Sequence, residues 1–251
     1  MKIALIGAGN VATVLGRLMA SKHHQIIQVM SRNILNAQTL AQEFGASFSD
    51  FNGKPDLSAD IFVLAVSDQA LDHLFSQQDM GHKLVLHTAG SASIDVLQKM
   101  SVNYGVLYPL QSLRKEMQTI PTIPFLVDGN TVDVAKFIEE FALSISNSVR
   151  RVGDDERLKL HTAAVVVSNF TNHLYAIAEE FCEKENIDFG MLKPLILETA
   201  YRVQSASPSK VQTGPAVRKD IITLDKHLRI LAAHPKLRTM YLRLSESIMN
   251  P

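Results

Sequence analysis

The stretch Met1-Lys2-Ile3-Ala4-Leu5-Ile6-Gly7-Ala8-Gly9-Asn10-Val11-Ala12 decides the fold of this chain. An apolar run too short for a helix leads into Gly-x-Gly-x-x-Ala, and an apolar pattern with helical spacing follows. This order predicts a buried strand, a tight turn and a helix N-terminus that can bind the pyrophosphate of a dinucleotide. Free backbone N–H groups and the helix dipole favour the anion there, and the alternative is an ordinary strand–helix turn. The predicted cofactor-binding residues of this turn are Gly7, Ala8, Gly9, Asn10, Val11 and Ala12.

The composition restricts the class of protein. With 251 residues, of which 46% are hydrophobic and 20% charged, the chain can form one large domain or two ordinary ones. The 25 basic and 25 acidic residues balance, so we expect neither nucleic acid nor a membrane as partner. One cysteine, Cys182, excludes an internal disulfide and indicates a reducing compartment. No stretch has the apolar length of a membrane span, and the first strand leaves no room for a signal peptide. We therefore predict a soluble, cytoplasmic protein with no metal site.

A change of pattern near Val152 predicts two domains. Short apolar runs alternate with helical patterns up to that residue, which is typical of a mostly parallel sheet of the Rossmann type. Residues 153–251 contain helical patterns alone, so we expect an α/β cofactor domain over 1–152 and an all-α substrate and dimerisation domain over 153–251, with a cleft between them. The predicted strands are 2–6, 25–30, 61–66, 84–87, 105–108, 125–127 and 148–152. The predicted helices are 11–21, 34–44, 70–75, 132–144, 154–184, 191–204, 216–233 and 235–248.

The end of the second strand indicates which nucleotide binds. NAD-binding proteins place a carboxylate about 20 residues after the glycines, where it holds the ribose 2′-OH. Here the strand is followed by Ser31, Arg32 and Asn33, and the guanidinium and hydroxyl suit a 2′-phosphate instead. We therefore predict NADP rather than NAD, the alternative for Arg32 being an exposed arginine at a helix start.

Small residues follow the next two strands and extend the predicted cofactor site. The carboxyl ends of parallel strands are the side on which open α/β sheets bind ligands. The alternative is that the Ser and Asp residues of both turns only cap the helices that follow, since these residue types are common at helix N-caps. The residues assigned to the cofactor here are Ala65, Val66, Ser67, Asp68, His87, Thr88, Ala89 and Gly90.

The predicted helix 154–184 has no charged residue between Leu160 and Ala178. A period of 3.6 predicts a core stripe of Ala163, Val166, Val167, Phe170, Leu174, Ile177 and Phe181. The other side carries His161, Ser168, Asn169, Asn172 and His173, a polar but uncharged face that suits a cleft wall or a subunit interface.

Four residues are the candidates for catalysis. His161 could act as general acid, and Asn169 and Asn172 could orient a substrate or stabilise developing charge. Tyr108 could donate a proton or anchor its loop. The alternative for the helical residues is a helix–helix interface in which the polar groups satisfy one another.

Two further residues are candidates for substrate binding. Gln111 belongs to the segment 108–112, which we expect near the nicotinamide. Arg218 is expected in the first turn of a helix capped by Thr213, where it would meet a substrate carboxylate or pair with Asp220.

Five motifs together resemble those of pyrroline-5-carboxylate reductases and deazaflavin-dependent NADP oxidoreductase-like proteins. They are Gly-Ala-Gly-Asn-Val-Ala at 7–12, Ser-Arg-Asn at 31–33, Ala-Val-Ser-Asp-Gln at 65–69, His-Thr-Ala-Gly-Ser at 87–91 and Val-Leu-Tyr-Pro-Leu-Gln-Ser at 106–112. Over nearly its full length, the chain resembles bacterial NADP oxidoreductases in which a Rossmann domain precedes a helical domain of unknown function with a segment like Thr213–Asp220. The resemblance implies NADP, a C-terminal domain like that of 6-phosphogluconate dehydrogenase-like proteins, and a homodimer formed through it.

One departure from related enzymes bears on the reaction. In β-hydroxyacid dehydrogenases and ketopantoate reductases, a catalytic lysine lies four residues before an asparagine, whereas Val165 stands at that spacing from Asn169. Pyrroline-5-carboxylate reductases lack this lysine, so imine reduction stays open. The predicted function is an NADP(H)-dependent oxidoreductase that transfers a hydride to or from a small carbonyl or imine substrate in the interdomain cleft. The alternative is a non-catalytic NADP-binding redox sensor or partner-binding protein.

Overall fold

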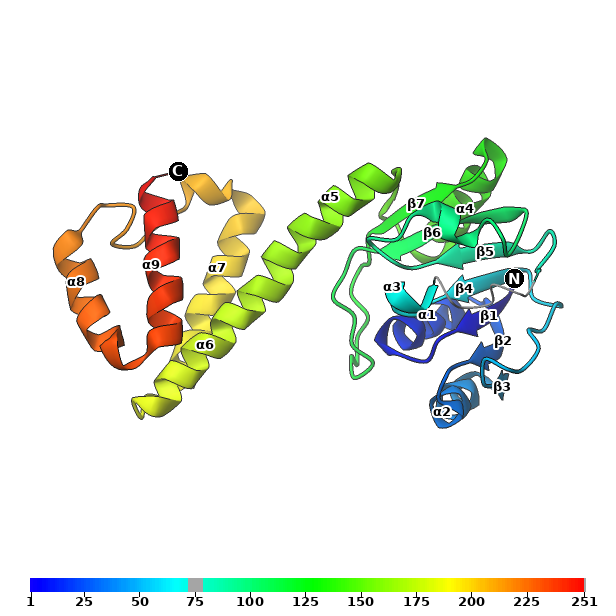
Figure 1. Ribbon diagram of the computed structural model, residues 1–251, viewed down its shortest axis with the longest axis horizontal. Helices are drawn as coiled ribbons and strands as arrows, with labels where there is room; N and C mark the ends of the chain where they lie inside the picture. The colour runs from blue at the N-terminus through cyan, green and yellow to red at the C-terminus, as the bar shows by residue number, and fades with distance from the viewer. Residues whose placement is uncertain (72–78, 251) are drawn as a thin grey trace. The chain divides into compact units, whose positions relative to one another are not determined.

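The computed structural model describes residues 1–71 and 79–250 and divides the chain into two compact units, Met1–Val166 and Val167–Pro251 (Figure 1). The sequence pattern changes at Val152, where the sheet ends, but the units divide farther along the chain. The reason is that the first turns of the helix after Val152 pack on the sheet, with Arg157 buried and Leu160 against the cluster that contains Tyr108.

The first unit is built on an eight-stranded sheet formed by the described residues. The strands are β1 (Lys2–Ile6), β2 (Gln25–Met30), β3 (Ser47–Ser49), β4 (Ile61–Leu64), β5 (Leu84–His87), β6 (Asn103–Pro109), β7 (Phe125–Gly129) and β8 (Val149–Arg151). Their order is β3-β2-β1-β4-β5-β6-β7-β8, and neighbours run parallel except for the antiparallel pair β6 and β7. The expected Rossmann-type, mostly parallel sheet is confirmed. Because strand order reverses between β1 and β4, a ligand crevice is expected at their carboxyl ends.

The strands are apolar on both faces because helices cover both. Alternate residues of β1 enter two clusters: Ile3 and Leu5 pack with Leu15 of α1, whereas Ala4 and Ile6 pack with Phe62 of β4. The helices of this unit are α1 (Asn10–Ser21), α2 (Ile34–Phe44), α3 (Asp68–Leu71), α4 (Val132–Ile145) and α5 (Asp154–Ala164). Residues 72–75 of the helix predicted over 70–75 lie outside the described residues.

The second unit is helical, and the residues described after Arg151 contain no strand, as predicted. A π-helix, Val165–Phe170, continues α5 directly into α6 (Thr171–Lys184). It is followed by α7 (Lys193–Ser205), α8 (Ile221–Ile230) and α9 (Pro235–Met249), with short 3₁₀ turns at Phe189–Leu192, Pro208–Lys210 and Leu231–Ala233. The helices α6 and α9 pack on each other, and the rings of Phe181 and His234 meet edge-on at 4.9 Å between centroids.

The predicted core stripe of the long helix is wrong in its first half. Val166, Val167 and Phe170 are 52%, 72% and 57% exposed, whereas Ile177 is buried. Ala163, which precedes the π-helix, is also exposed, and no residue of Val165–Phe170 is buried, so this part of the helix has no core-facing side within the described chain.

The helix expected from Ala216 begins later, at Ile221. Its N-cap is Asp220 rather than Thr213, and the Asp220 carboxylate accepts a hydrogen bond of 3.0 Å from the backbone N–H of Thr223. Gly214 and Lys219 both have positive φ, +110° and +54°, which breaks the helix before Asp220. Arg218 therefore lies in a turn and not on the first turn of a helix.

Candidate functional site

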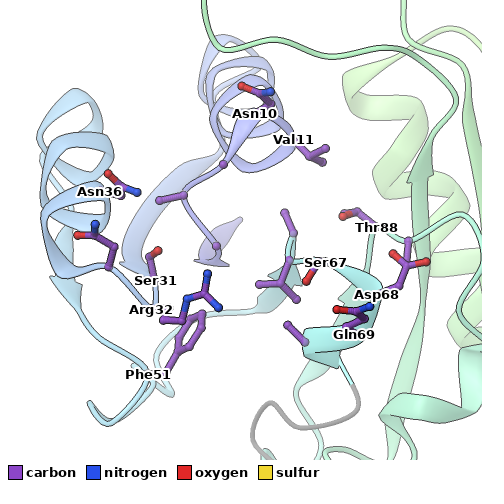
Figure 2. Close-up of a pocket in the computed structure, with 18 of the residues that line it drawn as sticks. Asn10, Val11, Ser31, Arg32, Asn36, Phe51, Ser67, Asp68, Gln69 and Thr88 are labelled. Carbon is purple, nitrogen blue, oxygen red and sulfur yellow. The ribbon is translucent and has the colours of Figure 1, made fainter. Parts of the chain in front are cut away.

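A cavity of about 1310 Å³ opens at the carboxyl ends of β1, β2, β4, β5 and β6 (Figure 2). This is the crevice that the strand order predicts, and its volume exceeds that of ordinary drug-sized pockets, as an extended dinucleotide requires. The described residues that line it are Gly7, Ala8, Gly9, Asn10, Val11, Ser31, Arg32, Asn33, Asn36, Phe51, Asn52, Ala65, Val66, Ser67, Asp68, Gln69, Ala70, Thr88, Ala89, Gly90, Tyr108 and His161.

The glycine turn has the geometry that a phosphate cradle needs. Gly7 has φ +121°, and a β-carbon there would lie 2.2 Å from the carbonyl oxygen of Ala65, so only glycine fits. Gly9 is the N-cap of α1 and has ordinary φ, and a β-carbon there would meet no described atom within 4 Å. Gly9, Asn10 and Val11 line the cavity, so the first turn of α1 borders open space, which fits a pyrophosphate. Ala12 is fully buried and serves the close packing of helix on strand rather than lining the cavity.

The loop that follows β6 is hydrogen-bonded to the start of α1, next to this turn. The side-chain oxygen of Asn10 accepts a hydrogen bond of 3.2 Å from the backbone N–H of Lys115. Arg17, two turns along α1, donates from Nη1 to the carbonyl oxygen of Lys115 at 2.6 Å and binds the Glu43 carboxylate through Nε and Nη2, each at 2.8 Å. The loop after β6 is thereby fixed to both α1 and α2.

The end of the cavity beside β2 fits the 2′-phosphate of NADP. Ser31 is buried, and Asn33 caps α2 by accepting a hydrogen bond of 3.0 Å from the N–H of Leu35. Arg32 lies beside the ring of Phe51 and points into the cavity (Figure 2). Asp68, the one carboxylate among the described lining residues, lies on the opposite side of the cavity, so an anion next to Arg32 meets no acidic side chain of this lining.

Three lining residues at this end were not predicted: Asn36, Phe51 and Asn52. Asn36 lies one helical turn after Asn33, a spacing that could have signalled it. Phe51 and Asn52 follow β3, a strand of three residues that is too short and polar to be predicted from periodicity.

The middle of the cavity is lined by the predicted turns after β4 and β5, together with Gln69 and Ala70. Asp68 begins α3, and its carboxylate accepts a hydrogen bond from the hydroxyl of Ser91. This bond joins the two turns at the level of Gly90. Ser67, Asp68 and Thr88 face the cavity from this side (Figure 2).

His87 does not line the cavity, which corrects its assignment to the cofactor. It is fully buried as the last residue of β5, with Nδ1 accepting a hydrogen bond of 3.2 Å from the N–H of Ala89. Side chains alternate along a strand, so the following residue, Thr88, reaches the cavity instead. Burial, assisted by the nearby Arg157 charge, lowers the pKa of His87 to about 4, and the ring is neutral at neutral pH.

Tyr108 and His161 meet at the edge of the cavity. The Tyr108 hydroxyl lies 2.8 Å from Nδ1 of His161, and the rings are edge-on with centroids 5.7 Å apart. A β-carbon added to Gly90 would lie 2.6 Å from Nδ1 of His161, so the imidazole rests directly on this glycine. Burial raises the pKa of Tyr108, and the negative charge of Asp68 raises it further. Tyr108 is therefore a protonated phenol that can donate a hydrogen bond.

The remaining predicted residues lie elsewhere. Gln111 is exposed, with its side-chain oxygen accepting a 2.9 Å hydrogen bond from the N–H of Ser112, and it is absent from the described lining of the cavity. Asn169 in the π-helix, Asn172 in α6 and Arg218 are all exposed residues of the second unit. Their roles toward a substrate stay predictions.

Neither a metal centre nor a membrane helix is found in the part of the chain that the structure describes. Residues 1–71 and 79–250 contain no group of three His, Cys, Asp or Glu side chains arranged to hold a metal ion. The helices within these ranges are too short or too polar to cross a bilayer.

Two family models match the chain. Residues 2–90 match the family described as NADP oxidoreductase, coenzyme F420-dependent, and residues 123–248 match a domain of unknown function, DUF2520. Glutamyl-tRNA reductase from Methanococcus maripaludis is 23% identical over 151 residues, 55% of this chain and 39% of that protein. The chain thus spans less than half the length of these curated relatives.

Solved structures resemble the chain over its whole length. A protein from Bacteroides fragilis, provisionally assigned as an NADP oxidoreductase, is 36% identical with a TM-score of 0.89, covering 100% of this chain and 98% of that one. Pyrroline-5-carboxylate reductase from Streptococcus pyogenes is 13% identical with a TM-score of 0.65, covering 100% and 99%. A reductive aminase from Aspergillus terreus, solved with NADPH and ethyl levulinate, is 16% identical with a TM-score of 0.70, covering 98% and 92%. At 13% and 16% identity, the pyrroline-5-carboxylate reductase and the reductive aminase show a likeness of fold alone.

The family follows from the extent of these matches. The domain of unknown function covers half of the chain, and the relative from Bacteroides fragilis covers all of it. The predicted resemblance is confirmed, as are, at the level of the family, an oxidoreductase and its cofactor NADP. The chain belongs to a family of NADP oxidoreductases in which a DUF2520 region, here residues 123–248 from β7 to α9, follows the NADP oxidoreductase region of residues 2–90.

Proposed function

We propose that the chain is an NADP(H)-dependent reductase of a small imine or carbonyl compound. The observation that carries this proposal is the Tyr108–His161 pair at the edge of a cavity whose other end suits a 2′-phosphate. Geometry of this kind is what a hydride-transfer enzyme must provide, since the cofactor supplies the electrons and the protein supplies position and a proton.

The residues of this chain would divide the work between two ends of the cavity. Gly9 and the first turn of α1 would hold the pyrophosphate, and Ser31 and Arg32 the 2′-phosphate. When bound, NADPH supplies a hydride to the carbon of the C=N or C=O bond. The Tyr108 hydroxyl would give its proton to the nitrogen or oxygen and take one back from His161, which recovers it from solvent. The products are then an amine or alcohol and NADP⁺, with atoms and charge balanced.

Imines are favoured over ketones as substrates by three observations. Val165 occupies the position at which lysine-dependent ketone reductases carry their lysine. The fold is shared with pyrroline-5-carboxylate reductase and with a reductive aminase. Asp68 near the phenol also suits the iminium ion that forms as Tyr108 gives its proton to the imine nitrogen, because a carboxylate stabilises a nearby positive charge.

A turnover screen tests the proposal. The purified protein is supplied with NADPH and a panel of cyclic imines, ketone–amine mixtures and keto acids, and loss of NADPH is followed by absorbance. We expect at least one imine to be reduced, and Tyr108→Phe to lower kcat about a hundredfold while NADPH binding is retained. Tyr104→Phe, on the same strand, is the matched control and keeps wild-type kcat. Tight NADPH binding without oxidation by any compound would instead favour the redox sensor.

We also propose that the helical unit forms a homodimer. No residue of α7 or α9 is buried within the chain. These helices nevertheless carry exposed apolar side chains, which are Leu195, Leu197, Tyr201, Val203, Leu242 and Leu244. Helices with apolar faces are stable in water when those faces are covered, and a second copy offers a matching surface.

A further inference from the structure

A buried arginine fixes α5 to the loop that follows β5. Arg157 is 1% exposed, and its Nη2 donates to the carbonyl oxygen of Ala92 and, at 2.8 Å, to Oδ1 of Asp154. The Asp154 carboxylate in turn accepts a hydrogen bond of 3.2 Å from the backbone N–H of Ile94. Two charged side chains of the first turn of α5 thus bind a single short loop.

Stability alone does not account for this arrangement. Burying a guanidinium destabilises the fold unless its charge is well paired, and well-packed apolar residues at such sites are often equally stable or more so. The Nε and Nη1 atoms of Arg157 are buried without a hydrogen-bond partner among the described residues, so part of this cost is not offset there. Arg157 and Asp154 do fix the orientation of α5 against the loop after β5, because charged hydrogen bonds hold both partners in one geometry.

These contacts fix the rotation of α5 and, with it, the position of the His161 side chain. Arg157 and His161 are four residues apart on α5 and lie on the same side of the helix. Ala92, whose carbonyl oxygen accepts the hydrogen bond from Arg157, lies in the same loop two residues after Gly90, the glycine on which the His161 ring rests. The anchor and the imidazole therefore contact the same loop one helical turn apart, and a rotation of α5 at Arg157 would move His161 away from Tyr108.

We propose that Arg157, together with Asp154, is a positioning residue that holds Nδ1 of His161 at the Tyr108 hydroxyl. It acts through His161, because its own side chain is buried and is not among the described residues that line the cavity. The catalytic part of this proposal rests on the proposed function, whereas the placement of His161 does not.

The experiment compares Arg157→Met with Arg150→Met in the full-length protein. Arg150 is the matched control, since it also pairs with a carboxylate of α5, Glu156 at 2.6 Å, but is exposed. The imidazole NMR signals of His161, assigned by their loss in His161→Asn, report the hydrogen bond without turnover. We expect Arg157→Met to move them in the same direction as Tyr108→Phe does, and Arg150→Met to leave them in place.

Kinetics give the second measurement. Arg157→Met should lower kcat by about ten- to a hundredfold, because small misplacements of a proton donor have effects of this size, with the KM for NADPH changed less than twofold. Arg157→Lys should restore part of kcat, since an ammonium still reaches one acceptor. If Arg157→Met does not fold, Asp154→Asn replaces it, with a smaller shift of the same sign expected.

The two proposals fail separately. Unchanged His161 signals in a folded Arg157→Met or Asp154→Asn protein would overturn the positioning role, whatever the activity. A wild-type protein that reduces none of the compounds would overturn the reductase, while the NMR comparison would still decide whether Arg157 places His161.

Discussion

Gly90 and His161 touch: a single β-carbon on the glycine would lie 2.6 Å from Nδ1 of the imidazole and 3.1 Å from the Tyr108 ring. The Tyr108–His161 pair therefore packs against a residue without a side chain. Three elements distant in the sequence, namely the turn after β5, the end of β6 and the last turn of α5, meet at this point. Substitutions at this contact can test how Tyr108 and His161 are placed without a large loss of fold stability.

We expect Gly90→Ala to lower kcat by about tenfold or more, because the added methyl group displaces His161 from Tyr108. Gly153→Ala is the control, since its φ is −74° and a β-carbon there meets no described atom within 4 Å. Steady-state kinetics on both variants make the comparison. Equal kcat values for the two would contradict the contact.

Substituting the two glycines of the first turn by alanine should affect different properties, namely the stability of the fold at Gly7 and the affinity for NADPH at Gly9. Gly7→Ala forces a β-carbon against the Ala65 carbonyl at positive φ, so we expect it to destabilise the fold by about 2 kcal/mol or more. Gly9→Ala has ordinary φ and open space, so its stability should stay within about 0.5 kcal/mol of wild type while NADPH binding weakens. Urea unfolding and NADPH titration test the pair together. A Gly9→Ala protein with unchanged affinity would show that no phosphate lies there.

Arg32→Ala should weaken the binding of NADPH by about ten- to a hundredfold, the size expected for a lost hydrogen bond to a charged group. NADH lacks the 2′-phosphate, so its affinity should change less than twofold. Isothermal titration with both cofactors measures the ratio. A uniform loss for NADPH and NADH would place Arg32 elsewhere on the dinucleotide.

Stability should fall in acid because of His87. Its folded-state pKa is lowered to about 4 from an ordinary value of 6.5, chiefly by burial. Between these values the unfolded chain binds a proton that the folded chain does not. The stabilisation is therefore complete above pH 6.5 and is lost as the pH falls toward 4, by roughly 3 kcal/mol in total. Urea unfolding at several pH values measures this slope. His87→Asn, which keeps an acceptor near the position of Nδ1, should flatten it; a slope equal to that of wild type would assign the effect to other groups.

Leu197→Lys should convert a dimer into a monomer, because it places a charge on the apolar surface of α7, where Leu197 is 56% exposed. Leu57→Lys in the first unit, 55% exposed, is the matched control and should leave the assembly intact. Sedimentation velocity over a range of concentrations separates the two forms. A wild-type protein that sediments as a monomer at every concentration would contradict the proposed homodimer.

Local signals in the sequence predict the sheet well and the site in part. The run from Lys2 to Ala12 carries its own strand, turn and helix start, and two of its small residues, Gly7 and Ala12, meet steric needs of the turn and of the packing of helix on strand. His161 and Tyr108 were predicted as separate candidates, but their contact depends on how α5 packs on β6, across 53 residues of sequence. A charged residue such as Arg157 is ordinarily exposed, so periodicity gives no sign that it is buried.

Irregular backbone explains the other errors. The π-helix at Val165–Phe170 has no Gly or Pro to mark it, and none of its residues is buried, although its apolar residues are spaced like a core stripe. Lys219 takes positive φ although it is not glycine, so the break before α8 was not visible, and Thr213 appeared to be the cap. Phe51 lies beyond a strand of three residues, which leaves no periodic pattern to detect.

The bond between Asn10 and Lys115 also bears on how the protein comes to fold. Its partners are 105 residues apart, and the nearby bond from Arg17 to Lys115 spans 98 residues. Ala65, whose carbonyl packs against Gly7, must also be in place. Contacts of such high sequence separation form slowly, since the intervening chain has to be ordered first. The turn of Gly7 and Gly9 is thus among the last parts of the fold to be completed, and affinity for the cofactor should arise only after the loop beyond β6 has docked.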